Sequence, residues 1–212
     1  MTTKPALTMS TTYAGKPVIA IDADGVLLDY GAAYPHAWQS AFGVFPRERD
    51  PEAYRPLDRW DVERLAGARL ELFRRQFDES FWSSIPAMPG AIDASHALQK
   101  AGHVLVCVSA LDPIYEQARL RNLRKLGFPI ERVIATPHAN VLGNPKAAAN
   151  TALQPIAFVD DFLPYLVGLP QGIHTALLRS HAVTADVGLS HFLALRRRPR
   201  EPGPGHRNPH AD

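Results

Sequence analysis

Two pairs of aspartates end short apolar runs that lie far apart in the chain: Asp22 with Asp24, and Asp160 with Asp161. Such apolar runs are typical of buried parallel strands, and ligands bind beyond the carboxyl ends of the strands in an open parallel sheet. Four carboxylates that share one sheet edge need a positive charge to offset their repulsion. An all-oxygen ligand set favours a hard cation. We therefore expect these four aspartates to bind Mg²⁺.

A hydroxyl and an ammonium group are expected at the same edge. Ser109 and Ala110 end a second apolar run, and Lys146 precedes the run that leads to the later aspartate pair. A phosphate between Mg²⁺ and Lys146 would complete the balance of charge. The Ser109 hydroxyl and neighbouring backbone N–H groups, including that of Ala110, would bind its remaining oxygens.

The spacing of the first pair has a chemical meaning of its own. Residues i and i+2 project to the same side of an extended chain, so Asp22 and Asp24 face one ligand. One carboxylate can attack phosphorus while the other handles the proton of the leaving group, because carboxylates act as nucleophiles through aspartyl-phosphate intermediates. Gly25 follows directly and allows the chain to turn sharply.

The remaining pattern predicts how these residues are positioned. Helical patterns at 91–101 and 113–126 alternate with apolar runs, which indicates right-handed crossovers between parallel strands. The second helix is marked by Asp112 as N-cap, Pro113 and a trailing Gly127. We therefore expect an α/β protein with a doubly wound, Rossmann-like parallel sheet. Its strands are predicted at 17–22, 103–109, 132–136, 155–159 and 172–178.

About 80 residues separate the first two predicted strands, too many for one crossover. We interpret the excess as a small helical cap inserted between these strands, with helical patterns at 33–42 and 61–77. Trp38, Trp60 and Trp82 are expected in the core of this insertion. The predicted organisation is a disordered leader (1–16), an α/β core (17–29 and 87–194), the helical cap (30–86) and a disordered basic tail (195–212).

Composition excludes several classes of protein. The chain has 212 residues and a formal net charge of +2, and its basic excess is confined to a tail rich in Pro and Gly. This balance argues against nucleic acid or membrane partners. The single cysteine, Cys107, lies in an apolar run and excludes an internal disulfide framework or a multi-cysteine zinc site. No apolar stretch approaches the roughly 20 residues that span a bilayer, so we expect a cytoplasmic protein.

The motifs resemble those of the haloacid dehalogenase (HAD) superfamily. The segment 19–26 resembles its first motif, an apolar strand followed by Asp-x-Asp. The segment 104–109 resembles the second, a strand that ends in Ser or Thr; Lys146 matches the third and 156–161 the acidic fourth. The four occur in order between residue 18 and about residue 178, and the insertion occupies the position of the family's helical cap.

The resemblance implies a role for each residue. Asp22 would be the nucleophile and a metal ligand, and Asp24 the general acid and base whose backbone carbonyl also binds the metal. Ser109 would bind phosphate, and Lys146 would steady both Asp22 and the phosphoryl group. The acidic pair of the fourth motif would hold Mg²⁺ directly or through water.

The expected function is that of a Mg²⁺-dependent phosphatase acting on a small phosphomonoester of the nucleotide or sugar phosphate type. The acid at position 24 favours phosphoryl transfer over carbon–halogen cleavage, because a phosphate ester has a leaving group to protonate. A phosphomutase and a non-catalytic phosphate-binding module that acts through a partner are the alternatives. Each residue alone also has a structural explanation in turn formation, capping or a solvated surface.

Overall fold

The computed structural model describes residue 13 and residues 15–137 and 143–178. Most of the predicted leader, the end of the predicted core range and the whole predicted tail lie outside these described residues. None of the described helices is long and apolar enough to cross a membrane.

The described strands form one five-stranded parallel sheet in the order β3-β2-β1-β4-β5. This confirms the predicted α/β, doubly wound fold class. β1 pairs with β2 on one side and with β4 on the other, so Ile19 lies opposite both Leu105 and Ala157. The strands are β1 (Val18–Ile21), β2 (Val104–Ala110), β3 (Ile130–Thr136), β4 (Ala157–Asp160) and β5 (His174–Leu177).

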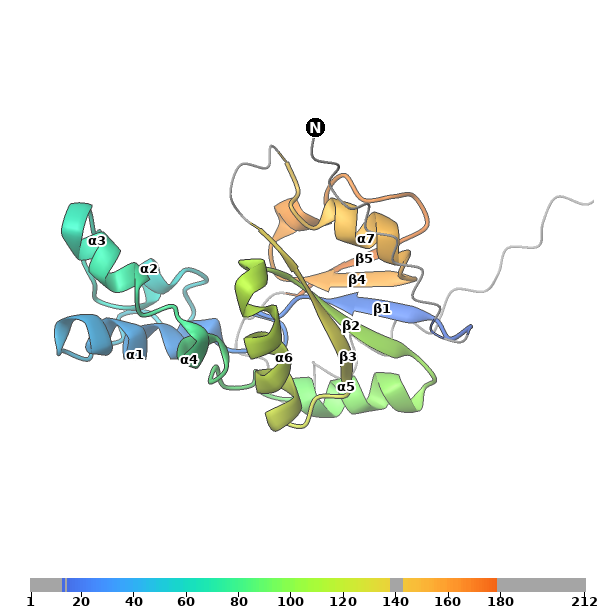
Figure 1. The fold of residues 1–212 in the computed structure, drawn as a ribbon, viewed down its shortest axis with the longest axis horizontal. Helices are drawn as coiled ribbons and strands as arrows, with labels where there is room; N and C mark the ends of the chain where they lie inside the picture. Colours follow the sequence, from blue (N-terminus) through green and yellow to red (C-terminus); the bar gives the residue numbers. More distant parts are fainter. Residues whose placement is uncertain (1–12, 14, 138–142, 179–212) are drawn as a thin grey trace, which may run out of the picture.

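Helices cover both faces of the sheet (Figure 1). Side chains alternate between the two faces of a strand. Ile19 and Ile21 therefore pack with the apolar residues of α5 (Ala91–Lys100) and α6 (Glu116–Lys125). Ala20 instead belongs to the cluster on the opposite face, which also contacts α7 (Ala147–Leu153). Both faces of β1 are buried, which explains its uninterrupted apolar sequence.

The helices within residues 30–82 lie together beside the sheet rather than over it (Figure 1). Their shared core is aromatic and includes the buried residues Trp38, Trp60 and Phe73. These helices are α1 (Tyr30–Phe42), α2 (Pro56–Arg59), α3 (Gly67–Arg74) and α4 (Glu79–Trp82).

The chain leaves and re-enters the sheet region at one place. The Asp29 backbone N–H donates to Pro86 O at 2.8 Å, and the Met88 N–H donates to Leu27 O at 2.9 Å. These bonds pair the two segments at which the predicted cap begins and ends. We refer to these two paired segments, residues 27–29 and 86–88, as the hinge, and to residues 30–86 as the insertion.

Two predicted helices differ from the structure. The helix predicted at 61–77 is wrong over its first turns: 61–66 has no helical structure, and only α3 is helical. Ala66 is extended and Gly67 has a φ of 53°, so a right-handed helix cannot run through this point. The pattern at 113–126 divides into a 3₁₀ turn, η1 (Pro113–Tyr115), and α6. Asp112 accepts a hydrogen bond from Ile114 N, as a capping residue does.

Truncation of a leucine in the sheet core should lower the free energy of unfolding far more than truncation of a leucine on the exposed face of the insertion. Leu105 is 1% exposed and Leu72 is 42% exposed. We expect Leu105→Ala to lower the free energy of unfolding by about 2–5 kcal/mol. Leu72→Ala should lower it by less than about 0.5 kcal/mol. Urea unfolding of both variants checks this, and equal losses would contradict the assignment of the core.

Candidate active site

Asp22 is fixed where β1 ends. Its backbone N–H continues the ladder to β4 by donating to Val159 O at 2.9 Å, and its Oδ1 accepts from Ala23 N at 2.7 Å. The side chain is buried. Burial is the main influence on this carboxyl and raises its pKa to about 8, against the lowering effect of Lys146. An ionised Asp22 therefore needs cationic neighbours.

Lys146 is the buried cation that joins the ends of two strands. Its Nζ lies 2.7 Å from Asp22 Oδ1 and 2.7 Å from Asp160 Oδ2, and the side chain is fully buried. Burial alone would lower the pKa of Lys146, but the two carboxylates raise it above the usual value. The ammonium thus stays charged between two acids that are themselves shielded from water.

Asn144 sets the position of Lys146 and was not identified from the sequence. Its Oδ1 accepts from the Lys146 backbone N–H at 2.9 Å, and its Nδ2 donates to the backbone carbonyls of Tyr165 and Val167. The segment that carries Lys146 is thereby tied to the segment after β4, which includes the 3₁₀ turn η2 (Leu163–Leu166). A polar residue two positions before the lysine leaves no periodic signal in the sequence.

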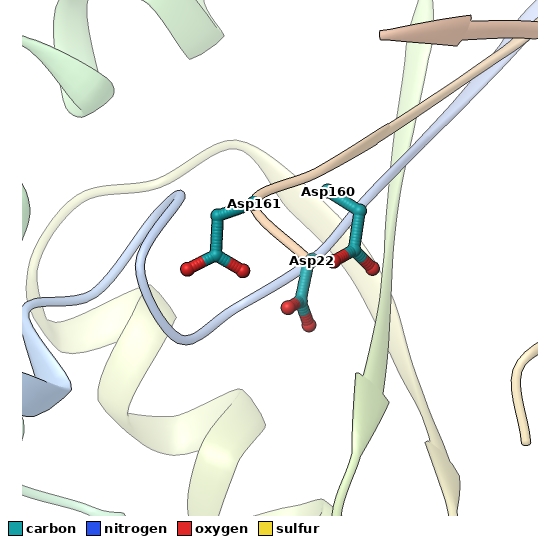
Figure 2. Close-up of side chains that lie close together, drawn as sticks. All are labelled: Asp22, Asp160 and Asp161. Carbon is teal, nitrogen blue, oxygen red and sulfur yellow. The ribbon is translucent and has the colours of Figure 1, made fainter. Parts of the chain in front are cut away.

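Asp160 and Asp161 complete a cluster of three carboxylates (Figure 2). One oxygen from each of Asp22, Asp160 and Asp161 lies within 4.8 Å of the other two, and the three side chains extend in the same general direction. Asp160 Oδ1 also accepts from Phe162 N at 2.8 Å. Burial and the neighbouring Asp160 raise the pKa of Asp161 to about 7. Three converging carboxylates form a donor set that fits a hard divalent cation such as Mg²⁺.

Gly25 lets the loop after β1 lie against this cluster. Its φ is +81°, and a Cβ at this position would lie 1.9 Å from Asp161 Oδ2. Two separate constraints therefore require glycine here: the left-handed backbone and the close approach of a carboxylate. The sequence pattern predicted the sharp turn but not the contact with Asp161.

Ser109 and Ala110 end β2, beside β1. Ser109 is buried, and its Oγ has no hydrogen-bond partner within the described parts of the chain. An unpartnered buried hydroxyl carries a desolvation cost unless a ligand or water satisfies it. Ala110 lies opposite Thr136 in the last pair of the β2–β3 ladder. The structure therefore places both residues at the predicted edge of the sheet.

Asp24 does not join the carboxylate cluster. Its side chain is paired with Arg119, whose Nη1 lies 2.8 Å from Asp24 Oδ1 and whose Nη2 donates to Oδ2 at 3.0 Å. Arg119 was also missed in the sequence. The available signal was its place on the apolar face of α6, where Ala118, Asn122 and Leu123 are buried as well.

Tyr54 brings the insertion to the site. It precedes α2, and its ring lies parallel to that of Phe162, with centroids 6.4 Å apart. Burial and the nearby Asp161 carboxylate raise the pKa of the Tyr54 hydroxyl above its usual value. Arg49, by contrast, serves the insertion itself, because it donates to the backbone carbonyls of Leu57 and Asp58.

Comparison with known proteins shows a likeness in fold to solved structures. No protein-family model matches the sequence, and no curated protein is significantly similar to it. The magnesium-bound HAD-hydrolase YfnB from Bacillus subtilis aligns with a TM-score of 0.50 and 17% identity, over 77% of this chain and 88% of that chain. A HAD family hydrolase from Deinococcus radiodurans with bound phosphate and sodium aligns with a TM-score of 0.49 and 18% identity, over 84% and 88%.

A hydrolase from Streptococcus pneumoniae gives a similar result, with a TM-score of 0.49 and 16% identity over 84% of this chain and 98% of that chain. At these identities the likeness concerns the fold alone, and the alignment with the Bacillus protein agrees with the α/β, doubly wound fold predicted from the sequence.

A side chain at position 25 should displace Asp161 and weaken the metal site. We expect Gly25→Ala to lose most of the rise in melting temperature that Mg²⁺ produces in the unaltered protein. Gly43→Ala is the matched control, because Gly43 has a φ of +77° but a Cβ there would meet nothing within 4 Å. Both variants carry left-handed strain of about 1 kcal/mol, and only the first meets a carboxylate. An equal Mg²⁺ response in the two variants would contradict this account.

The stability of the metal-free protein should fall as pH rises. The carboxyl pKa values of Asp22 (about 8) and Asp161 (about 7) lie above the value of about 4 in an unfolded chain. Between these values the folded state holds more protons, so stability is lost with rising pH. In EDTA we expect a lower melting temperature at about pH 8 than at about pH 6, and a larger rise on adding Mg²⁺ at the higher pH. The opposite trend in EDTA would contradict the burial of these acids.

Proposed function

We propose that this protein is a Mg²⁺-dependent phosphatase that hydrolyses a small phosphomonoester through an aspartyl-phosphate intermediate. The observation that supports this best is the buried Lys146 ammonium, which contacts Asp22 and Asp160 at 2.7 Å each. It provides a fixed positive charge beside a carboxylate that is placed to attack. The Ser109 hydroxyl at the neighbouring strand end, which has no hydrogen-bond partner among the described residues, supplies a donor for a phosphate oxygen.

In the first step, Asp22 attacks phosphorus in line with the ester oxygen. Lys146 Nζ and Ala23 N both contact Oδ1, so Oδ2 is the oxygen that we assign to the attack. A bond forms between Oδ2 and phosphorus while the bond from phosphorus to the ester oxygen breaks. Asp24 gives its proton to the departing alcohol.

In the second step, water attacks phosphorus from the side that the alcohol has left. Asp24 accepts the proton of this water, the bond from Asp22 to phosphorus breaks, and inorganic phosphate leaves. Lys146 offsets negative charge on the transferring group in both steps, where preorganised charge gives the largest reduction in barrier. The cycle ends with Asp22 ionised and Asp24 protonated, as it began.

Mg²⁺ would be held by Asp22, Asp160 and Asp161, whose oxygens already converge. When bound, the ion would neutralise the acidic cluster and the phosphoryl oxygens, which Lys146 alone cannot do. The roles of Ala110 and of the Asp24 carbonyl as further ligands belong to the same proposal.

The insertion would act as a cap that selects small substrates. Tyr54 stacks on Phe162 next to Asp161, so the insertion already reaches the acidic cluster. A cap that closes over the acidic cluster would favour a soluble phosphorylated metabolite, of the nucleotide or sugar phosphate type, over a phosphoprotein.

The test is phosphate release from a broad panel of phosphomonoesters, with Mg²⁺ and with EDTA. We expect release only with Mg²⁺, and a loss of at least about 10³-fold in Asp22→Asn, because no nucleophile remains. Asp93→Asn is the control, since Asp93 is an exposed acid on α5. It should retain full activity.

Two results would contradict the proposal. One is a folded, Mg²⁺-loaded protein that releases phosphate from no ester. The other is release that Asp22→Asn leaves intact. Transfer of the phosphoryl group to a second sugar hydroxyl instead of water would identify a phosphomutase, with the same nucleophile.

A further inference from the structure

A fully buried arginine on α6 is paired with the carboxylate to which we assign proton transfer. Arg119 has no exposed surface, and its two terminal nitrogens contact the two oxygens of Asp24 at 2.8 and 3.0 Å. Of these two contacts, only the one from Nη2 to Oδ2 is a hydrogen bond, and Nη1 approaches Oδ1 as a close ion pair, so the guanidinium holds one oxygen of Asp24 directly and limits the movement of the other. Asp24 itself remains partly open, with 27% of its side chain exposed, so the pairing does not seal it from a ligand.

The insertion supplies the other surface against which Arg119 packs. The ring of Trp82, in α4, lies 5.0 Å from the guanidinium carbon. Nε and Nη1 of Arg119 make no hydrogen bond to the residues that the structure describes. Among the described residues, Asp24 is the acid that contacts this guanidinium, and its Oδ2 accepts from Nη2 while Oδ1 makes no hydrogen bond there and can carry the proton to be transferred. The position of each group in this pair therefore depends on the other.

The same helix also holds the hinge. Asn122, one turn after Arg119, is buried and donates from Nδ2 to Ile85 O at 2.9 Å, next to the point where the chain returns to the sheet. Arg121 forms an exposed ion pair with Glu79 at the start of α4. One face of α6 thus fixes the hinge and the Asp24 carboxylate together.

We propose that Arg119 is a positioning residue for Asp24, which it holds in the orientation that delivers a proton to the leaving oxygen. This inference rests on the proposed function and adds a residue that the four motifs do not contain. Arg119 acts through Asp24 and not on the phosphoryl group. Substitution of Arg119 should therefore slow hydrolysis most for esters whose leaving group must be protonated, and least for esters whose leaving group departs as an anion.

Two aryl esters of similar size distinguish this role from a general loss of activity. The leaving group of p-nitrophenyl phosphate departs readily as an anion, whereas that of phenyl phosphate needs a proton far more. We expect Arg119→Met to lower kcat/KM for phenyl phosphate by at least about tenfold, and for p-nitrophenyl phosphate by less than about threefold, within the range that general acid catalysis covers. kcat/KM is the informative constant, because it includes the step in which the leaving group departs.

Further variants supply the controls. Asp24→Asn should show the same selective loss, and adding Arg119→Met to it should cause no further change. Lys125→Met, which removes an exposed cation from the same helix, should leave both esters unaffected. Arg119→Lys keeps a charge beside Asp24 but loses the two-point contact, so it tests orientation in a protein that retains the buried cation.

The possible failures are distinguishable. If the unaltered protein hydrolyses neither ester, the proposed function and this inference both fall. If it hydrolyses both but Arg119→Met reduces the two equally, or lowers activity further in the Asp24→Asn background, only the role of Arg119 is overturned. A lysine variant with full activity on phenyl phosphate would likewise refute the need for two-point orientation.

Discussion

The bridge from Lys146 to Asp22 and Asp160 is the interaction on which the rest of the site depends. Three ionisable groups are withdrawn from water at the adjoining ends of β1 and β4. An isolated charge in such a place would be prohibitively costly, but the ammonium between two carboxylates makes the arrangement tolerable. With both acids ionised, the group has one net negative charge. In the proposed function, Mg²⁺ would offset this charge and that of the phosphate.

Neighbouring elements serve this bridge from several directions. Asn144 links the lysine to the segment after β4, and Gly25 lets the loop after β1 approach Asp161. Tyr54 reaches the same acids from the insertion. The short strands β1 and β4 are buried on both faces, so their ends provide a rigid base from which loops of little regular structure can aim their side chains.

Much of this arrangement was predictable from the sequence. Uninterrupted apolar runs indicated parallel strands, and acids after the runs indicated which edge carries the chemistry. Cys107, which lies in one of these apolar runs, is buried. The division into core and cap and the roles of the site residues stay predictions. The role of Arg119 could not be predicted, because its partner Asp24 is distant in the sequence and comes close only in the folded chain. The spacing of residues along α6 does not reveal such a partner.

The short helices of the insertion could not be predicted from the sequence, for a different reason. α2 and α4 have four residues each, too few for an apolar period to be visible. Their positions are set by an aromatic core, within which Phe73, Phe77 and Phe81 pack edge to face. The pattern at 61–77 contained the right apolar residues, but the backbone at Gly67 interrupts it.

The hinge affects how the sequence of such a protein can change during evolution. Because the chain leaves and re-enters the sheet through two adjacent segments, the ends of the insertion are held a hydrogen bond apart. A segment whose ends meet can be lengthened, shortened or exchanged with little effect on the scaffold that receives it. In the proposed function, the insertion selects the substrate and the sheet edge carries the chemistry, so the two can change separately. New specificities can arise in the insertion while the buried lysine and its acids remain as they are.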